Sequence, residues 1–141
     1  MANYNSKCRA NYFTVTDVDE FIDIINHLSG EDEIAYFEHD TDKGKYMFYC
    51  EYNLTGYISD PDCDDCTDEA RDIMVEKLQK ILPDGEAIIL TEAGSEKMCY
   101  ISCVATIITN KDVKYVNLSD VAIEKAREML GNPDFTTEDN Y

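Results

Sequence analysis

Apolar residues in this chain change repeatedly between two patterns, the three- or four-residue spacing of a helix face and the continuous runs of buried strands. The clearest helical stretch follows Asp17, which with Glu20 three residues later has the pattern of a helix start. Ser29-Gly30 indicates the end of this helix. Its predicted apolar face consists of Phe21, Ile24, Ile25 and Leu28. Because this face has to be buried, the rest of the chain must form a layer against it.

Two further stretches have helical spacing. The second predicted helix begins with Thr67 as its cap and ends at about residue 82, before Pro83-Asp84-Gly85. Its apolar face consists of Met74, Leu78 and Ile81. The third predicted helix begins at Ser119-Asp120 and ends before Gly131. Its predicted inner face consists of Ala122, Ala126, Met129 and Leu130.

The segments between these helices have the composition of strands, rich in β-branched and aromatic residues. We predict strands over residues 8–15, 33–38, 45–58, 86–92, 98–109 and 113–118. Turns are predicted at 42–44 and 93–95, so most neighbouring strands form hairpins. The sequence therefore predicts a single α+β domain over residues 1–141, with a mainly antiparallel sheet of about five to six strands and three helices on one face.

A weak internal repeat accompanies this order. Residues 17–58 and 70–111 align without gaps at an offset of 53, which superimposes the first two helix faces and places Cys50 on Cys103. Two tandem helix–hairpin units in one sheet would produce this pattern, and so would coincidence.

The charge limits the classes of partner. The 141 residues contain 30 Asp and Glu but only 12 Lys and Arg, which gives a net charge of −18. This disfavours direct binding of nucleic acid or of an anionic membrane. A hydrophobic share of 44% is enough for a folded core. Eighteen charges match about 30 Å of duplex DNA at one charge per about 1.7 Å, so a basic, nucleic-acid-binding protein is the favoured partner.

The chain has no sequence signal for export. Residues 1–5 lack the apolar stretch of a signal peptide, and no run approaches the roughly 20 apolar residues of a membrane span. We therefore expect a cytoplasmic protein whose six cysteines are thiols.

Residues 60–69 are the most acidic segment, with six carboxylates in ten residues. Asp60, Asp62 and Asp64 have the spacing of the first EF-hand ligands, but Asp65 stands where that loop needs Gly. Arg71 stands where it needs a bidentate Glu. A weak cation site of another kind stays open, as does a solvated loop that caps the second helix.

Cys63 and Cys66 in the same segment form a C-x-x-C pair before a helix, a pattern of redox and zinc sites. The two Asp residues between them oppose thiolate formation, and no second C-x-x-C supplies the other zinc ligands. The alternative hypothesis of a small metal-binding or redox protein rests on Cys63, Cys66, Asp60, Asp62 and Asp64.

Motifs of catalysis are missing from the sequence, which has neither a phosphate-binding G-x-x-x-x-G-K nor a G-x-S-x-G elbow. We expect no enzymatic activity and no cofactor. The predicted partner-binding residues are instead acidic and lie in the 60–69 loop and the 31–42 hairpin: Asp60, Asp62, Asp64, Asp65, Asp68, Glu69, Glu31, Asp32, Glu33, Glu38, Asp40 and Asp42. A third acidic cluster, on the first helix, consists of Asp17, Asp19, Glu20 and Asp23.

Three stretches carry a resemblance to a known family: residues 9–15 (RANYFTV), residues 78–119 (from LQKILPDGEAIIL to KYVNLS) and residues 131–137 (GNPDFTT). In these the chain resembles small uncharacterised proteins encoded on phages and other mobile elements of gut-dwelling Firmicutes. The resemblance brings no catalytic residue. It implies the context of acidic inhibitors of host defence, of the anti-CRISPR and anti-restriction types that imitate DNA. The implied function is a non-enzymatic inhibitor that binds a CRISPR–Cas effector or a restriction enzyme.

Overall fold

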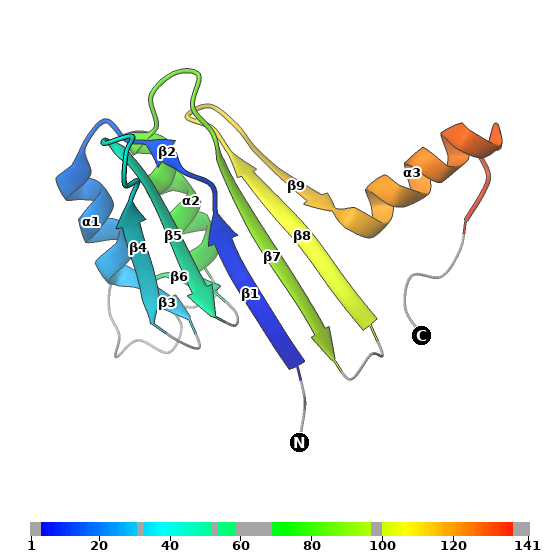
Figure 1. Ribbon diagram of the computed structural model, residues 1–141, viewed down its shortest axis with the longest axis horizontal. Helices are drawn as coiled ribbons and strands as arrows, with labels where there is room; N and C mark the ends of the chain where they lie inside the picture. The colour runs from blue at the N-terminus through cyan, green and yellow to red at the C-terminus, as the bar shows by residue number, and fades with distance from the viewer. Residues whose placement is uncertain (1–3, 31–32, 52–53, 59–68, 97–99, 137–141) are drawn as a thin grey trace.

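Seven of the described strands form one antiparallel sheet in a computed structural model (Figure 1). The structure describes residues 4–30, 33–51, 54–58, 69–96 and 100–136. Its elements in chain order are β1 (Tyr4–Ala10), β2 (Phe13–Thr14), α1 (Val18–His27), β3 (Leu28–Gly30), β4 (Ile34–Glu38), β5 (Lys45–Glu51), β6 (Leu54–Tyr57), α2 (Ala70–Ile81), β7 (Ile88–Glu96), β8 (Tyr100–Ile108), β9 (Val113–Asn117) and α3 (Leu118–Leu130).

The β1 strand occupies the middle of the sheet. It pairs with β5 on one side and with β7 on the other, and β4 pairs with β5 beyond. The β8 and β9 strands continue the sheet past β7, and β2 pairs with β5 next to β1. A separate two-stranded sheet joins β3 to β6. All these pairings are antiparallel, which confirms the predicted α+β class.

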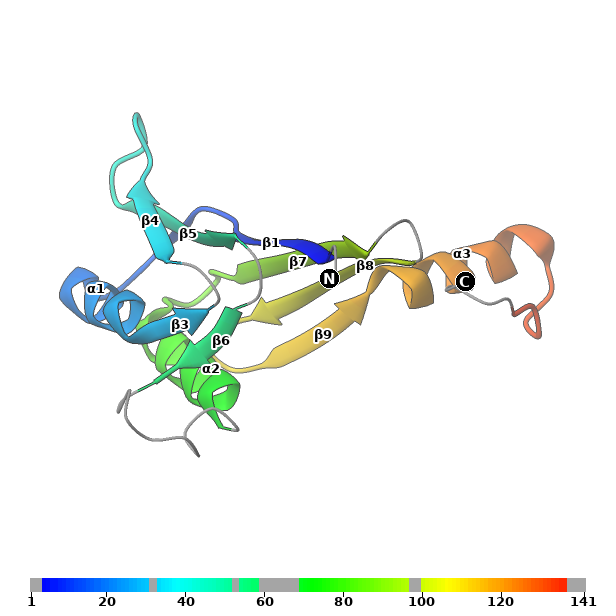
Figure 2. The same ribbon diagram turned by 90° about the horizontal axis from the view of Figure 1, so that it is seen from below.

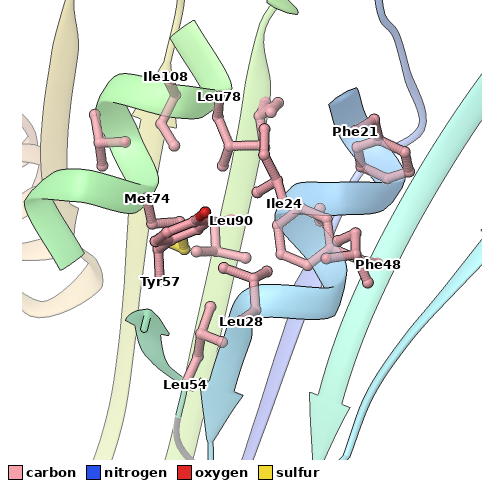
Figure 3. Packing of buried hydrophobic residues seen from close by; sticks show 14 of the residues in the cluster. Phe21, Ile24, Leu28, Phe48, Leu54, Tyr57, Met74, Leu78, Leu90 and Ile108 are labelled. Carbon is pink, nitrogen blue, oxygen red and sulfur yellow. The ribbon is translucent and has the colours of Figure 1, made fainter. Parts of the chain in front are cut away.

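The core lies between the large sheet and the helices α1 and α2, which Figure 2 shows on the same side of the sheet. Every residue of the two predicted helix faces is buried. They meet side chains of the sheet and of β6 in one cluster, whose labelled members in Figure 3 are Phe21, Ile24, Leu28, Phe48, Leu54, Tyr57, Met74, Leu78, Leu90 and Ile108. The sequence pattern of these two helices therefore predicts their packing correctly.

The third helix departs from the prediction. α3 extends beyond β9 and away from the core (Figures 1 and 2), and none of its residues, all of which are described, is buried. Met129 and Leu130, predicted to face the core, are 87% and 61% exposed. Helical spacing shows only that a helix has an apolar face, so it could not predict that this face lies outside the core.

Two predicted strands are divided in the structure. The segment 8–15 becomes β1 and β2, because Asn11 lies between them and uses its side chain for pairing. Its Oδ1 accepts from the Ile89 backbone N–H at 2.7 Å, and its Nδ2 donates to the Ala87 carbonyl at 3.1 Å. The segment 45–58 becomes β5 and β6, which belong to different sheets.

The predicted turn at 93–95 is wrong. β7 continues through this segment, where Gly94 pairs with Ser6 of β1 and with Ser102 of β8. Strands on both sides supply partners for its backbone groups, so the glycine does not end the strand. The predicted turn at 42–44 is confirmed: Gly44 has a φ of 92° and the Lys45 N–H donates to the Asp42 carbonyl.

The helix ends follow the predicted chemistry in part. Asp17 caps α1 by accepting from the Glu20 N–H at 3.2 Å. α2 begins at Ala70 after Glu69, which caps it without a side-chain hydrogen bond. Thr67, the predicted cap, lies outside the described residues. The cap of α3 is Asn117, two residues before the predicted start, and accepts from the Ser119 N–H at 2.9 Å.

A helix followed by a hairpin occurs twice, as α1 with β4–β5 and as α2 with β7–β8. Whether a duplication produced this order stays a prediction. None of the helices in the described part of the chain has the length and apolar character needed to cross a membrane.

Candidate partner-binding surfaces

The predicted acidic hairpin surface is only partly acidic in the structure. Glu38, Asp40 and Asp42 lie at the tip between β4 and β5 and are exposed. Two lysines share this tip: Lys43 Nζ lies 3.9 Å from Glu38 Oε1, and Lys45 Nζ lies 3.2 Å from Asp42 Oδ2. Both pairs are solvent-exposed, so they stabilise the fold little, but they offset part of the negative charge locally.

The predicted acidic residues that the structure describes do not gather on one surface. Glu38 pairs with Tyr46 near the hairpin tip, whereas Glu33 precedes Ile34, which pairs with Cys50 near the other end of β5. Glu33 and Glu38 are five positions apart, which is roughly 16 Å at the rise of a strand. Glu69 lies at the start of α2, two residues before Arg71, whose Nη1 donates to the Leu54 carbonyl of β6. The remaining predicted residues lie outside the described part: Glu31, Asp32, Asp60, Asp62, Asp64, Asp65 and Asp68.

The solvent side of the helical layer is a stronger acidic surface. Asp19, Glu20 and Asp23 of α1 are exposed, and α1 contains neither Lys nor Arg. On α2, Asp72 and Glu76 are exposed one turn apart. We call these five residues the acidic helical surface. The pairs Asp19–Asp23 and Asp72–Glu76 have i,i+4 spacing, where like charges disfavour a helix by a few tenths of a kcal/mol per pair.

Two of the three α2 cations are turned toward other partners, and the third, Lys80, follows Glu76 at i+4 on this surface. Arg71 is turned inward, where its Nη2 donates to Glu92 Oε1 of β7. Lys77 Nζ lies 4.7 Å from the centre of the Tyr57 ring, in the geometry of a cation–π contact. His27 stacks on the same Tyr57 ring at 5.0 Å between centroids. Of the three α2 cations, only Lys80 is exposed.

The buried thiol of Cys8 lies within range of the charge of the inward Arg71. Cys8 is 2% exposed and lies opposite Cys50 in the β1–β5 register. Burial raises the pKa of Cys8 to about 12; the charge of Arg71 lowers it and Cys50 raises it further, both by less. Because the thiolate is the reactive form, this site favours a structural role for Cys8.

The opposite side of the large sheet differs in character. No described segment covers it, and we call it the open face (Figure 2). Two shallow hollows of about 390 Å³ each lie on it, one on either side of β1. Their shared residues are Lys7 and Arg9. The other residues that line the hollows include Tyr12, Phe37, Met47, Tyr49, Ile89, Thr91 and Ala93.

Arg9 and Lys7 are exposed cations on β1, at the middle of the open face. Lys7 lies 3.6 Å from Glu51, but among the described residues Arg9 has no ion-pair partner. Phe37 is 51% exposed and stacks on Tyr49 with 5.8 Å between ring centroids. Arginine beside exposed aromatic rings is typical of interface residues that contribute strongly to binding.

Cys63, Cys66, Asp60, Asp62 and Asp64 lie outside the described residues. Elsewhere, within the described ranges, no three His, Cys, Asp or Glu side chains come together as a metal site would require. The alternative hypothesis therefore stays a prediction from the sequence.

Comparison with models of protein families finds no match to this chain, and comparisons with curated proteins and with solved structures find none either.

Sequence reasoning missed two components of these surfaces. Asp72 and Glu76 lie one turn apart in a helix that was predicted, so their shared face could have been found from spacing alone. The position of Arg9 follows from strand alternation, since Cys8 and Ala10 are buried and Lys7 and Arg9 are exposed. What the sequence lacks is any sign that the exposed side of β1 lies in the middle of a sheet.

Proposed function

We propose that this protein is a non-catalytic acidic inhibitor that occupies the nucleic-acid-binding surface of a basic protein, such as a CRISPR–Cas effector or a restriction enzyme. The observation that carries the proposal is the acidic helical surface. Its carboxylates face solvent, while two of the three α2 cations are engaged with Glu92 and Tyr57.

The spacing of these carboxylates supports competition with nucleic acid. Residues four apart on a helix are separated by about 6 Å along its axis. Each helix therefore presents one charge per about 6 Å, within a factor of two of the roughly 3.4 Å charge spacing of one DNA strand. A surface of this density attracts a basic cleft over long range and accelerates association at low salt.

Retention of like-charged pairs also supports a binding role. The like-charged spacing of Asp19–Asp23 and Asp72–Glu76 disfavours the two helices, and at Asp23 neither a first-turn position nor a nearby Lys offsets this cost. These side chains are exposed and contribute nothing to the core. A surface selected for stability alone would mix the signs of its charges.

The function is tested by DNA cleavage assays with a panel of CRISPR–Cas effectors and restriction enzymes, run at increasing concentrations of this protein. We expect inhibition of at least one enzyme that is competitive with DNA and weakens as salt rises. Absence of inhibition across the panel would contradict the proposal. Inhibition that does not change with ionic strength would contradict it as well.

The contact surface is mapped with variants of equal charge change. One variant combines Asp19→Asn, Asp23→Asn, Asp72→Asn and Glu76→Gln; its control combines Asp84→Asn, Asp112→Asn, Asp120→Asn and Asp134→Asn. A third variant changes Asp60, Asp62, Asp64 and Asp65 to Asn. We expect the first variant to be at least about tenfold weaker as an inhibitor, because four ionic interactions with the partner are removed, and the control to change little. Weaker inhibition by the third variant alone would assign the contact to the 60–69 loop.

A further inference from the structure

His39 follows β4 and is a hydrogen-bond acceptor for the backbone of the β4–β5 tip. Its Nδ1 accepts from the Thr41 N–H at 3.2 Å and from the Asp42 N–H at 3.0 Å. A backbone N–H can only donate, so Nδ1 must carry the lone pair of a neutral imidazole, with the ring proton on Nε2. The Thr41 hydroxyl oxygen lies 3.4 Å from the same nitrogen. The turn over Thr41 and Asp42 therefore requires the unprotonated ring.

His27, the other histidine of the chain, has the opposite geometry. Its Nδ1 lies 2.8 Å from the Asp23 carbonyl oxygen. A carbonyl can only accept, so this Nδ1 carries a proton in the neutral ring as well. A second proton on Nε2 leaves the bond in place. Protonation is therefore compatible with the hydrogen bond of His27, whereas it removes the acceptor that His39 provides.

Other contacts hold the ring of His39 and the base of the tip. The ring lies edge-on to Tyr12, between β1 and β2, with 4.8 Å between centroids. The His39 N–H donates to the Lys45 carbonyl at 2.8 Å, and the Gly44 N–H donates to Glu38 Oε2 at 3.1 Å. None of these contacts uses Nδ1 of His39. The base of the tip therefore keeps its hydrogen bonds when the ring gains a proton, and the loss is confined to the turn.

The charges around His39 determine how readily it gains that proton. The charged groups of the same tip have both signs: Glu38, Asp40 and Asp42, and Lys43 and Lys45. From the sheet, Tyr12 contacts the ring, and Arg9 lines the same hollow as Tyr12. The carboxylates favour the imidazolium and the cations oppose it. Histidine changes its charge between about pH 5 and pH 8, so a moderate fall in pH is sufficient to protonate such a ring.

We propose that protonation of His39 releases the Thr41–Asp42 turn, so that the β4–β5 tip is ordered at neutral pH and mobile in acid. A protonated Nδ1 is a donor, and the two backbone N–H groups that point at it lose their acceptor. The tip projects from the side of the sheet away from α2 (Figure 2). Its release changes how the carboxylates of Asp40 and Asp42 are presented to a partner. The switch is independent of the acidic helical surface, which belongs to α1 and α2.

NMR spectroscopy of the full chain at about pH 8 and about pH 5 tests the proposal. At about pH 8, the ring nitrogen shifts should show the proton of His39 on Nε2 and that of His27 on Nδ1. The backbone order parameters of Thr41 and Asp42 should be about 0.85 at the higher pH and below about 0.6 at the lower pH. Those of the paired residues of β5 should stay unchanged.

The matched variant is His39→Asn. The Oδ1 of Asn is bonded to Cγ as Nδ1 of His is, so it accepts from the same backbone groups but gains no proton in this pH range. We expect its tip to be ordered at both pH values. His39→Ala has no acceptor and should be mobile at both. His27→Gln, the control for loss of a histidine elsewhere, should keep the pH response of the unchanged chain. Circular dichroism at both pH values verifies that each variant folds.

Three results would overturn the proposal. The first is a proton on Nδ1 of His39 at about pH 8, and the second is a tip that is equally ordered at both pH values. The third is a mobile tip in His39→Asn: at about pH 5 alone, it would assign the response to the carboxylates of the tip, and at both pH values it would show that the acceptor does not order the turn. None of these measurements depends on inhibition, so the proposed function and the switch can fail separately.

Discussion

The helices α1 and α2 differ from α3 in burial, although local signals are at least as good in α3. α1 and α3 each begin with a side-chain cap, from Asp17 and Asn117. α3 also ends in a left-handed Gly131, whereas α1 and α2 run into extended residues. Yet α1 buries three residues and α2 buries five, while α3 buries none. Local sequence thus decides where a helix forms, and the rest of the chain decides whether it belongs to the core.

Truncation of a side chain should give the largest difference in unfolding free energy between the buried helices α1 and α2 and the exposed helix α3. Leu78→Ala in α2 removes a fully buried side chain and should lower the free energy of unfolding by about 2–5 kcal/mol. Leu130→Ala in α3 removes a side chain that is 61% exposed and should change it by less than about 0.5 kcal/mol. Denaturant titration measures both. Equal effects would mean that α3 belongs to the cooperative core.

A glycine substitution tests the packing of α2 on β6. Gly56 has a φ of +136°, and a Cβ there would lie 2.5 Å from the backbone carbonyl carbon and oxygen of Ala70. We expect Gly56→Ala to reduce the free energy of unfolding by about 1–3 kcal/mol, from strain and from displacement of α2. Gly131→Ala has open space around it and carries only the left-handed backbone cost of about 1 kcal/mol, confined to α3. The same denaturant titration compares the two variants. A larger loss of unfolding free energy in Gly131→Ala than in Gly56→Ala would contradict the assignment of α2 to the core and of α3 to the outside.

The two helix caps give a smaller effect of the same kind. Asp17→Ala should lower global stability by about 1 kcal/mol, because α1 unfolds with the core. Asn117→Ala should leave the thermal unfolding midpoint unchanged and instead speed amide hydrogen exchange in the first turn of α3. If Asn117→Ala lowered the midpoint as much as Asp17→Ala, α3 would have to unfold together with the core.

The smallest expected effect is on the pH dependence of folding stability, through the carboxylate of Glu86. Burial alone would raise the pKa of Glu86, but hydrogen bonds from the Thr14 N–H, the Thr14 hydroxyl and the Ala87 N–H lower it on balance. A lowered folded-state pKa gives stability that is present above the ordinary value of 4.5 and is lost as pH falls below it. Glu86→Gln should therefore show a weaker loss of stability between about pH 5 and pH 3 than the unchanged chain. If the stability of Glu86→Gln and that of the unchanged chain fell equally with pH, the contribution of Glu86 would be ruled out.

The fold could be predicted from the sequence wherever a pattern was local. The α1 and α2 faces, the Asp17 cap and the 42–44 turn needed only spacing and turn chemistry. The segment 93–95 was wrongly predicted as a turn because the pairing of Gly94 depends on strands distant in sequence. Met129 and Leu130 were wrongly placed in the core because an apolar face does not specify what covers it.

The candidate surfaces could be predicted less well. Net charge and the carboxylates of α1 were visible in the sequence. The inward turn of Arg71 toward Glu92, which leaves the helical layer acidic, depends on a contact between residues 21 positions apart. The exposed Arg9 also required knowledge of which strands flank β1. Charge composition therefore indicates a class of partner, whereas tertiary pairing decides where the charge is uncompensated.

The proposed function requires the acidic helical surface, and not the open face, to make the ionic contact with a basic partner. The most direct test is the salt dependence of the dissociation constant with the enzyme that is inhibited in the cleavage panel. We expect neutralisation of Asp19, Asp23, Asp72 and Glu76 to reduce the slope of log affinity against log salt by roughly one for each carboxylate that pairs with a cation of the partner. Arg9→Glu and the control variant at Asp84, Asp112, Asp120 and Asp134 should leave the slope unchanged. An unchanged slope after neutralisation of the helical surface, or a reduced slope with Arg9→Glu, would contradict the account.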